Sequence, residues 1–211
     1  MKLILVVSKL NLSDWETISF MKKYEWNAGK YEKYSSGQQK WAKELIEKLN
    51  INENESVLDV GCGDGKVTAQ IASKIPGGFV KGIDNSESMV KLAQKKYPAD
   101  KYPNLSFTLM DAKDLRFSNQ FDVVFSNAAL HWVGDHKKAF QGIYNSLKPA
   151  GRILIQAGGK GNAAAAFEII DEMTLMKKWA PYLKNFKSPY NFFPFSVQEK
   201  RTNKRYYKAV M

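Results

Sequence analysis

Three glycines in alternate positions, Gly61, Gly63 and Gly65, follow the mostly apolar run 57–60 and are the strongest candidates for chemistry in this sequence. Glycine allows a sharp turn and lets a ligand approach the main chain, because no Cβ stands in the way. Asp84 ends the next apolar run, 23 positions after Gly61. A carboxylate at the tip of a strand beside such a loop can accept hydrogen bonds from both hydroxyls of a ribose. The pattern predicts a nucleoside site, with helix capping as the alternative role of Asp84.

The residues around the glycines argue against a dinucleotide as the ligand. Lys66 stands where the dinucleotide fingerprint G-x-G-x-x-G requires its third glycine. Asp59, two residues before Gly61, would repel a pyrophosphate but suits a ligand with an ammonium or sulfonium charge. No G-K-[ST] sequence follows the loop, so a phosphate-binding loop is excluded more firmly. We therefore expect a positively charged nucleoside ligand.

The elements that must position these residues follow from hydrophobic patterning. Short apolar runs alternate with helical segments between residues 56 and 155, which predicts βαβ units and a parallel sheet covered by helices on both faces. Pro149 and Gly151 are expected to end a helix before the fifth strand begins. We predict strands over 56–60, 79–83, 105–110, 122–126 and 152–156, and helices over 38–49, 66–74, 86–96, 136–147 and 163–179.

The sequence D-V-G-C-G-D-G followed by G-I-D resembles the first two motifs of the class I S-adenosylmethionine-dependent methyltransferases. Three later segments agree with that family in order and spacing: M-D-A at 110–112, F-D-V-V-F-S-N-A-A-L-H-W-V at 121–133 and L-K-P-A-G-R-I-L-I at 147–155. The resemblance covers residues 56–156, about half of the chain. It implies an α/β fold with a doubly wound, mostly parallel sheet (the Rossmann-like methyltransferase fold) and S-adenosyl-L-methionine as the cofactor.

The resemblance also implies which residues bind this cofactor, and it implies no metal. Residues after the first strand would hold the methionine end, residues after the second strand the ribose and adenosine, and residues after the third the adenine amino group. Two residues at the end of the fourth strand would face the sulfonium and the acceptor. The residues implied for the methionine end are Asp59, Gly61 and Gly63, and those for the ribose and adenosine are Asp84, Asn85 and Met89. Asp111 and Ala112 are implied for the adenine amino group, and Ser126 and Asn127 for the sulfonium and acceptor.

The segment S-N-A-A-L-H-W-V, residues 126–133, bears on the methyl acceptor. It resembles the trans-aconitate methyltransferase group and related small-molecule enzymes, several of which esterify carboxylates. By this resemblance His131 and Trp132 would line the acceptor pocket, although core packing explains Trp132 equally well. Enzymes that methylate the amino groups of bases usually carry N-P-P-aromatic after the fourth strand, and Asn127 is instead followed by A-A-L. We expect methyl transfer to a small-molecule acceptor, with a carboxylate oxygen favoured.

The chain divides into three segments that we expect to form one domain. Residues 1–50 are expected to form an N-terminal helical lid; within them residues 26–41 resemble the lid of small-molecule members, in which Tyr31, Ser36 and Gln38 would lie near the cofactor or acceptor. Residues 51–160 would form the cofactor-binding core, and residues 161–211 a C-terminal helix, an aromatic cover and a basic tail.

The C-terminal segment departs from the family pattern. The family fold implies two more strands, the last one antiparallel beside the fifth, and no convincing pair follows Trp179. We therefore expect the last one or two strands to be missing and the edge of the fifth strand to be exposed. Met1–Phe20 also has no counterpart in the family pattern, which favours Met21 as the natural start. A shortened domain that binds cofactor or a partner without turnover is the first alternative function.

Composition gives weaker constraints. The chain has 211 residues, a formal net charge of +11 and a single cysteine, which fits a reducing, cytoplasmic location. No apolar run approaches the ~20 residues of a membrane span, and the first apolar run is too short for a secretory signal. Residues 198–211 carry five basic groups and one acidic group. A solvated terminus explains this tail best, and nucleic acid is an unlikely partner; an RNA or protein methyltransferase guided by the tail is the second alternative. Nothing in the sequence indicates an oligomeric state.

Overall fold

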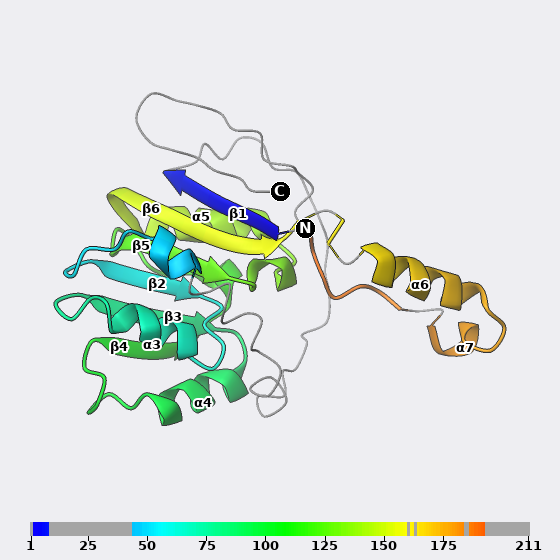
Figure 1. The fold of residues 1–211 in the computed structure, drawn as a ribbon, viewed down its shortest axis with the longest axis horizontal. Helices are drawn as coiled ribbons and strands as arrows, with labels where there is room; N and C mark the ends of the chain where they lie inside the picture. Colours follow the sequence, from blue (N-terminus) through cyan, green and yellow to red (C-terminus); the bar gives the residue numbers. More distant parts are fainter. Residues whose placement is uncertain (1, 9–43, 160, 163, 184–185, 193–211) are drawn as a thin grey trace.

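The computed structural model describes residues 2–8, 44–159, 161–162, 164–183 and 186–192. Its centre is a six-stranded sheet in the order β1-β6-β5-β2-β3-β4 (Figure 1). Five neighbouring strands are parallel, so the predicted doubly wound α/β fold is confirmed. These strands, which match the five predicted ones, are β2 (Ser56–Val60), β3 (Phe79–Asp84), β4 (Leu105–Leu109), β5 (Phe121–Asn127) and β6 (Leu147–Gly158).

The helices that connect the parallel strands also lie where the sequence predicts them. They are α3 (Lys66–Ala72), α4 (Glu87–Lys96) and α5 (His136–Ser146), and two short 3₁₀ turns, η1 (Ala112–Asp114) and η2 (Leu130–Trp132), follow β4 and β5. Helix α4 begins where Ser86 caps it, because the Ser86 side chain accepts a hydrogen bond from the Met89 N–H at 3.4 Å. Residues 44–48 are helical, and the rest of the helix predicted over 38–49 lies mainly outside the described residues.

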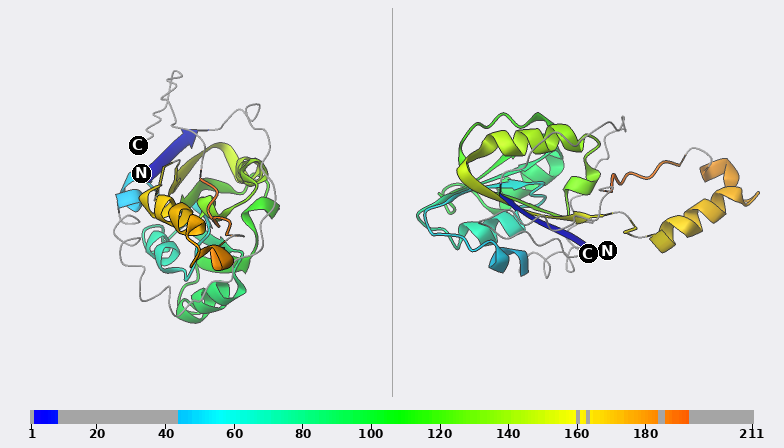
Figure 2. Two further views of the ribbon diagram at one scale, coloured as in Figure 1. Left: turned by 90° about the vertical axis from the view of Figure 1, so that its right-hand side faces the viewer. Right: turned by 90° about the horizontal axis from the view of Figure 1, so that it is seen from above.

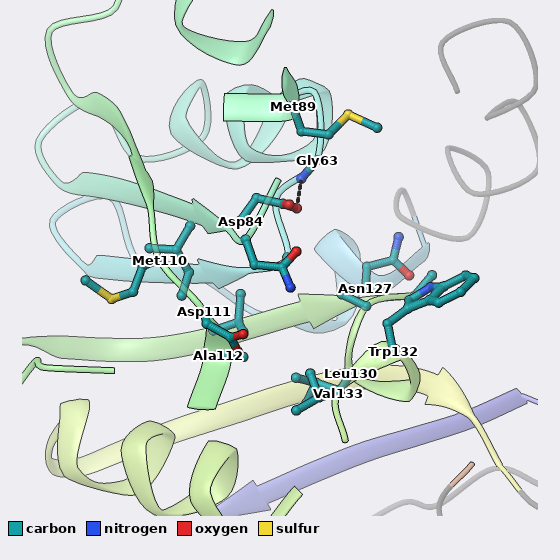
Figure 3. Close-up of a pocket in the computed structure, with 16 residues that line it drawn as sticks. Gly63, Asp84, Met89, Met110, Asp111, Ala112, Asn127, Leu130, Trp132 and Val133 are labelled. Carbon is teal, nitrogen blue, oxygen red and sulfur yellow. Dashed lines mark hydrogen bonds between the residues drawn. The ribbon is translucent and has the colours of Figure 1, made fainter. Parts of the chain in front are cut away.

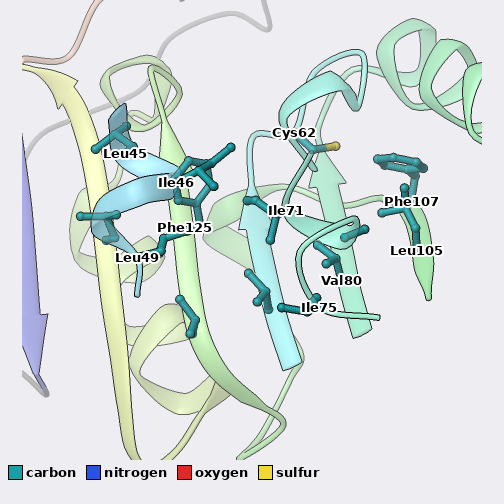
Figure 4. Close-up of a cluster of buried hydrophobic side chains, with 14 of the residues drawn as sticks. Leu45, Ile46, Leu49, Cys62, Ile71, Ile75, Val80, Leu105, Phe107 and Phe125 are labelled. Carbon is teal, nitrogen blue, oxygen red and sulfur yellow. The ribbon is translucent and has the colours of Figure 1, made fainter. Parts of the chain in front are cut away.

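The core forms on both faces of the sheet because successive strand residues point to opposite sides. Val57 belongs to a cluster that α3, α4 and the helical residues near Leu45 cover, whereas the next residue, Leu58, packs with α5 on the other face. Figure 4 shows part of the first cluster, in which Phe125 and Val80 come from the sheet. The near-continuous apolar runs of the parallel strands thus have the two-sided burial that their sequences predict.

Residues 2–8 correct the prediction of a helical lid at this point of the chain. They form β1 (Lys2–Ser8), which pairs antiparallel with β6 from Lys2↔Gly158 to Ser8↔Arg152. The apolar and β-branched run L-I-L-V-V has high strand propensity, and the edge of β6 offers it unpaired N–H and C=O groups. The expectation of an exposed edge on the fifth parallel strand is therefore wrong. The remainder of the predicted lid, 9–43, lies outside the described residues.

The start of β6 also differs from the prediction. Pro149 and Gly151 do not separate a helix from a strand; they lie inside β6, which begins at Leu147. Leu147 pairs with Phe121 and Arg152 with Val123, so the residues between them bulge out of the ladder. Such a bulge is one of the few places in a sheet where proline is tolerated, because its missing N–H is not needed for pairing.

Beyond β6 the chain leaves the sheet. Helices α6 (Ala164–Leu175) and α7 (Ala180–Leu183), here called the arm, stand away from the body and bury none of their residues (Figures 1 and 2). Residues 186–192, here called the strap, run back to the body. No strand follows β6 within the described part of the chain, and the basic tail lies outside it. None of the helices described is long and apolar enough to cross a membrane.

Candidate functional site

A pocket opens at the carboxyl ends of the parallel strands (Figure 3). Ligands of open α/β sheets bind at this edge, where loops leave adjacent strands. Nine of the residues that the sequence assigned to the site line it: Gly61, Gly63, Asp84, Asn85, Met89, Asp111, Ala112, Asn127 and Trp132. The remaining lining residues were not predicted: Val60, Ile83, Met110, Ala128, Ala129, Leu130 and Val133.

The glycine loop is held in place by the end of β3. The N–H groups of Gly61 and Cys62 both donate to the Ile83 carbonyl, at 2.8 and 2.9 Å. Gly61 has φ +80°, in the left-handed region that favours glycine, and a Cβ there would collide with the side chain of Ala129. The loop can therefore adopt this shape only without a side chain at Gly61, which leaves backbone facing the pocket.

Asp84 connects the loop to the start of α4. Its Oδ2 accepts from the Gly63 N–H and its Oδ1 from the Ser86 N–H, both at 2.9 Å. Burial raises the pKa of Asp84, while the backbone N–H groups of Ser86 and Gly63 act in the opposite direction. Each carboxylate oxygen accepts one of these bonds and keeps a second lone pair, so Asp84 can still accept hydrogen bonds from two ribose hydroxyls.

Asp111 and two methionines form the neighbouring part of the pocket. Asp111 caps η1 by accepting the Lys113 N–H at 3.0 Å, and it lies between Met110 and Ala112 on the pocket wall. Met89 contributes from α4 and is buried. A polarizable apolar slot with a carboxylate at its rim suits a flat heterocycle that carries an amino group.

Three predicted site residues do not line the pocket. Asp59 is buried beneath the glycine loop, where its Oδ2 accepts from the Thr68 hydroxyl at 2.7 Å. Burial raises the pKa of Asp59 to about 7; the Thr68 hydrogen bond opposes this shift, and the nearby Asp84 adds to it. Ser126 is fully buried and donates to the Val60 carbonyl at 2.8 Å, so it connects β5 to β2. His131 is the third, and Gln38, like Tyr31 and Ser36, lies outside the described residues.

The end of β5 carries a buried polar atom for which the described residues supply no hydrogen-bond partner. Asn127 Oδ1 is buried and has no hydrogen-bond partner among the described residues, yet its residue lines the pocket. The next residue, Ala128, has φ +55°, and its N–H donates to the Gln156 carbonyl at 2.7 Å. An unpaired buried acceptor is costly, and a ligand with a donor or a positive charge would satisfy it. This atom and the open backbone of the glycine loop fit the cofactor that the sequence implies.

His131 lies next to the pocket wall but faces the end of β6. Its Nδ1 accepts from the Gly158 N–H at 3.2 Å, and burial lowers its pKa to about 4, with His136 adding to the shift. A neutral ring whose Nδ1 accepts must carry its proton on Nε2. His131 is therefore poorly suited to remove a proton, since the Gly158 N–H already occupies its lone pair.

The residues missed by the sequence fall into two groups. Val60, Ile83 and Met110 end or follow predicted strands, so the rule that ligands bind at carboxyl ends would have found them. The other four, Ala128, Ala129, Leu130 and Val133, belong to a turn whose shape depends on the positive φ of Ala128. No sequence signal indicates such a φ for alanine.

Comparison with known proteins agrees with this geometry. A model of the methyltransferase domain matches residues 51–208. The trans-aconitate 2-methyltransferase of Deinococcus radiodurans is 34% identical over 131 residues, which are 62% of this chain and 48% of that protein. The malonyl-[acyl-carrier protein] O-methyltransferase of Priestia megaterium is 31% identical over 143 residues, which are 66% of this chain and 51% of that protein.

A solved structure extends the comparison to three dimensions. Phosphoethanolamine N-methyltransferase 2 of Haemonchus contortus, in complex with S-adenosyl-L-methionine, matches with a TM-score of 0.57 and 26% identity over 74% of this chain and 34% of that one. The chain spans about half the length of the curated relatives it matches. Family model, motifs and fold agree: the chain belongs to the methyltransferase domain family, among the class I S-adenosylmethionine-dependent methyltransferases.

Proposed function

We propose that this chain transfers a methyl group from S-adenosylmethionine to a small-molecule acceptor, with a carboxylate oxygen as the preferred nucleophile. One observation carries the proposal: the pocket at the ends of the parallel strands combines an open glycine backbone, two carboxylates and the buried Asn127 Oδ1, which has no partner in the described part of the chain. When bound, the cofactor supplies a methyl group made electrophilic by the positive charge on sulfur. Such a ligand needs acceptors and negative charge around it, which this pocket provides.

Each part of the pocket has one proposed task. Asp84 would accept the ribose hydroxyls, with Asn85 and Met89 beside the adenosine, and Asp111 with Ala112 would meet the adenine amino group. The backbone of Gly61 and Gly63 would hold the methionine end. Asp59 would act from below, as a buried negative charge once the ligand's positive charge favours its ionised form. Asn127 would lie nearest the reacting centre.

The acceptor side supports a nucleophile that arrives already ionised. The described pocket wall near Asn127 consists of Ala128, Ala129, Leu130, Trp132 and Val133, and none of these can remove a proton. His131 is neutral and its Nδ1 is occupied by the Gly158 N–H. A carboxylate needs no base, because acids of this kind are ionised at neutral pH, so alignment and removal of water suffice.

The names of the relatives support the same acceptor. Two of them specify trans-aconitate and malonyl-[acyl-carrier protein], and both of these compounds are carboxylic acids. The structural relative specifies phosphoethanolamine, which offers an amine, so the amine is the competing acceptor to test.

We keep a cytoplasmic location as part of the proposal, because the single cysteine, Cys62, is buried and unpaired.

Turnover assays can separate these acceptors. Formation of S-adenosylhomocysteine would be measured with trans-aconitate, a malonyl thioester, phosphoethanolamine and unmodified RNA as acceptors. We expect product with at least one of the acids and none with RNA. The Asp84→Ala variant is the control, since it should abolish turnover of every acceptor at cofactor concentrations that saturate the unaltered chain.

The other outcomes have distinct meanings. Turnover of phosphoethanolamine alone would overturn the choice of a carboxylate while leaving methyl transfer intact. Activity on RNA that disappears when residues 198–211 are deleted would favour a nucleic-acid methyltransferase. Cofactor binding without turnover of any acceptor would favour a shortened domain that no longer catalyses.

A further inference from the structure

The strap places a second layer of aromatic rings behind the pocket wall. Trp132 lines the pocket, and the ring of Tyr190 lies 4.4 Å from the Trp132 ring, centroid to centroid. The ring of Phe192 stacks on Tyr190 at 5.3 Å with an interplanar angle of 8°. The Asn191 N–H donates to the His131 carbonyl at 2.6 Å, which fixes the strap to η2. The strap is thus separated from the pocket by a single side chain.

The end of β6 is shaped to receive the strap. A Cβ on Gly158 would lie 2.8 Å from the Phe192 ring, closer than real Cβ contacts, so only glycine leaves room for that ring. The same Gly158 donates its N–H to His131 Nδ1 at 3.2 Å. His131 in turn lies 5.6 Å from the Tyr190 ring. Three segments far apart in the sequence therefore meet around one neutral imidazole.

The arm is connected to this cluster through one residue of α6. The ring of Phe167 meets both the Tyr190 and Phe192 rings edge to face, each at 6.1 Å. Aromatic pairs in such geometries stabilise a contact beyond the area they bury. A displacement of the arm would therefore shift Phe167, and through the rings of the strap it would change the position of Trp132.

We propose that Tyr190 and Phe192 are positioning residues for the methyl acceptor: they hold Trp132 as the acceptor-side wall of the pocket and so determine which acceptors fit. The proposal rests on the proposed function. Cofactor affinity should not depend on the strap, because Asp84, Asp111 and the glycine loop belong to other strands. An acceptor that meets a fixed aromatic wall and the Asn127 amide is expected to be flat beside its reacting oxygen, as an unsaturated acid is.

The test uses two pairs of variants with matched controls. Tyr190→Ala removes the ring that supports Trp132, and Tyr190→Phe keeps it. Gly158→Ala forces the Phe192 ring to move, whereas Gly134→Ala adds a Cβ with nothing within 4 Å. For each variant, KM and kcat for trans-aconitate, the dissociation constant of S-adenosylmethionine and the acrylamide quenching of Trp132 fluorescence would be measured. A parallel set that also carries Trp132→Phe isolates the Trp132 signal.

We expect Tyr190→Ala and Gly158→Ala to raise the KM for trans-aconitate roughly five- to tenfold and to increase Trp132 quenching, with cofactor affinity unchanged. Tyr190→Phe and Gly134→Ala should behave like the unaltered chain. Unchanged quenching in Tyr190→Ala, or an equal loss of cofactor affinity, would overturn the positioning role even if methyl transfer holds. If trans-aconitate is not turned over, the proposed function fails for that acid, and quenching with cofactor affinity still decides whether the strap holds Trp132.

Discussion

The two halves of the pocket are built in different ways. The proposed cofactor half consists of the glycine-loop backbone and of acids at the ends of neighbouring strands, within 60–63, 83–89 and 110–112. In the proposed acceptor half, Trp132 forms part of the pocket wall, and the neutral rings of His131, Tyr190 and Phe192 meet behind it, beside Gly158. Short motifs therefore specify the part that binds a ligand common to the whole family. Long-range packing specifies the part that must differ between members.

Burial shifts the pKa values of two groups beside the pocket, one next to each half, in opposite directions. It raises the pKa of the acid Asp59 to about 7 and lowers the pKa of the base His131 to about 4. In each case the desolvated side chain favours its neutral form. Asp59 can therefore become charged when a cationic ligand binds above it, whereas His131 stays neutral near pH 7.

The largest expected effect tests the backbone of the cofactor half. Gly61→Ala places a Cβ against Ala129 at φ +80°. The left-handed conformation and the overlap together should destabilise the chain by about 2–5 kcal/mol. Thermal unfolding and calorimetric titration with S-adenosylmethionine should both reveal the loss. Gly134→Ala is the matched control, with an expected effect within about 0.5 kcal/mol; equal effects of the two variants would refute the tight approach at Gly61.

The next effect compares the two halves by pH. Because the folded pKa of Asp59 is raised from 3.8 to about 7, its contribution to stability is full below about pH 4 and is lost as pH rises toward 7. His131 acts in the opposite sense, since its folded pKa is lowered from 6.5 to about 4. Its contribution is present above about pH 6.5 and is lost as pH falls through about 4.

Urea unfolding between pH 4.5 and 8 can separate the two contributions. Asp59→Asn should remove a decline of a few kcal/mol, roughly 1.4 kcal/mol for each pKa unit, and so uncover the rise in stability that His131 contributes up to about pH 6.5. His131→Gln, whose amide oxygen can still accept the Gly158 N–H, should remove a rise and make the decline steeper. If both variants shift the slope of stability against pH in the same direction, the opposite pKa shifts of Asp59 and His131 are contradicted.

The smallest effect lies where the two halves meet. Ala128→Gly relieves a φ of +55°, and we expect a gain of about 0.5–1 kcal/mol in the free energy of unfolding. The adjacent Ala129 has a φ of −118°, so Ala129→Gly should cost about 0.5–1 kcal/mol. Urea denaturation of both variants measures the difference. The same sign in both would show that backbone strain at Ala128 contributes little.

The sequence predicted the cofactor half because its signals are local. Five apolar runs and the alternate glycines lie within βαβ units, so spacing brings Gly63 and Asp84 to one edge, and the family resemblance added Asp111 after the third strand. Asp59 was assigned to the pocket by resemblance, but sequence spacing does not show that its side chain turns beneath the loop toward Thr68. Ser126 was also assigned to the pocket but does not line it, because its hydroxyl donates to the Val60 carbonyl of the neighbouring strand, a contact that sequence spacing does not show.

The parts that escaped prediction depend on long-range pairing. Strand β1 forms with residues 152–158, about 150 positions away, and an isolated apolar run of five residues does not indicate its partner. The aromatic cover was expected from composition. The sequence does not show which ring supports Trp132. In the folded chain Gly158 leaves room for Phe192, Phe192 stacks on Tyr190, and Tyr190 contacts Trp132.

Calorimetric titration of S-adenosylmethionine into the unaltered chain and into Asp84→Ala tests the central claim most directly, with the exposed Asp100→Ala as the control. Two hydrogen bonds from ribose hydroxyls to a carboxylate should contribute about 3 kcal/mol or more. We therefore predict single-site binding to the unaltered chain and to Asp100→Ala, and an affinity at least roughly 100-fold weaker for Asp84→Ala. No binding to the unaltered chain at millimolar cofactor, or equal affinity in all three proteins, would contradict the account.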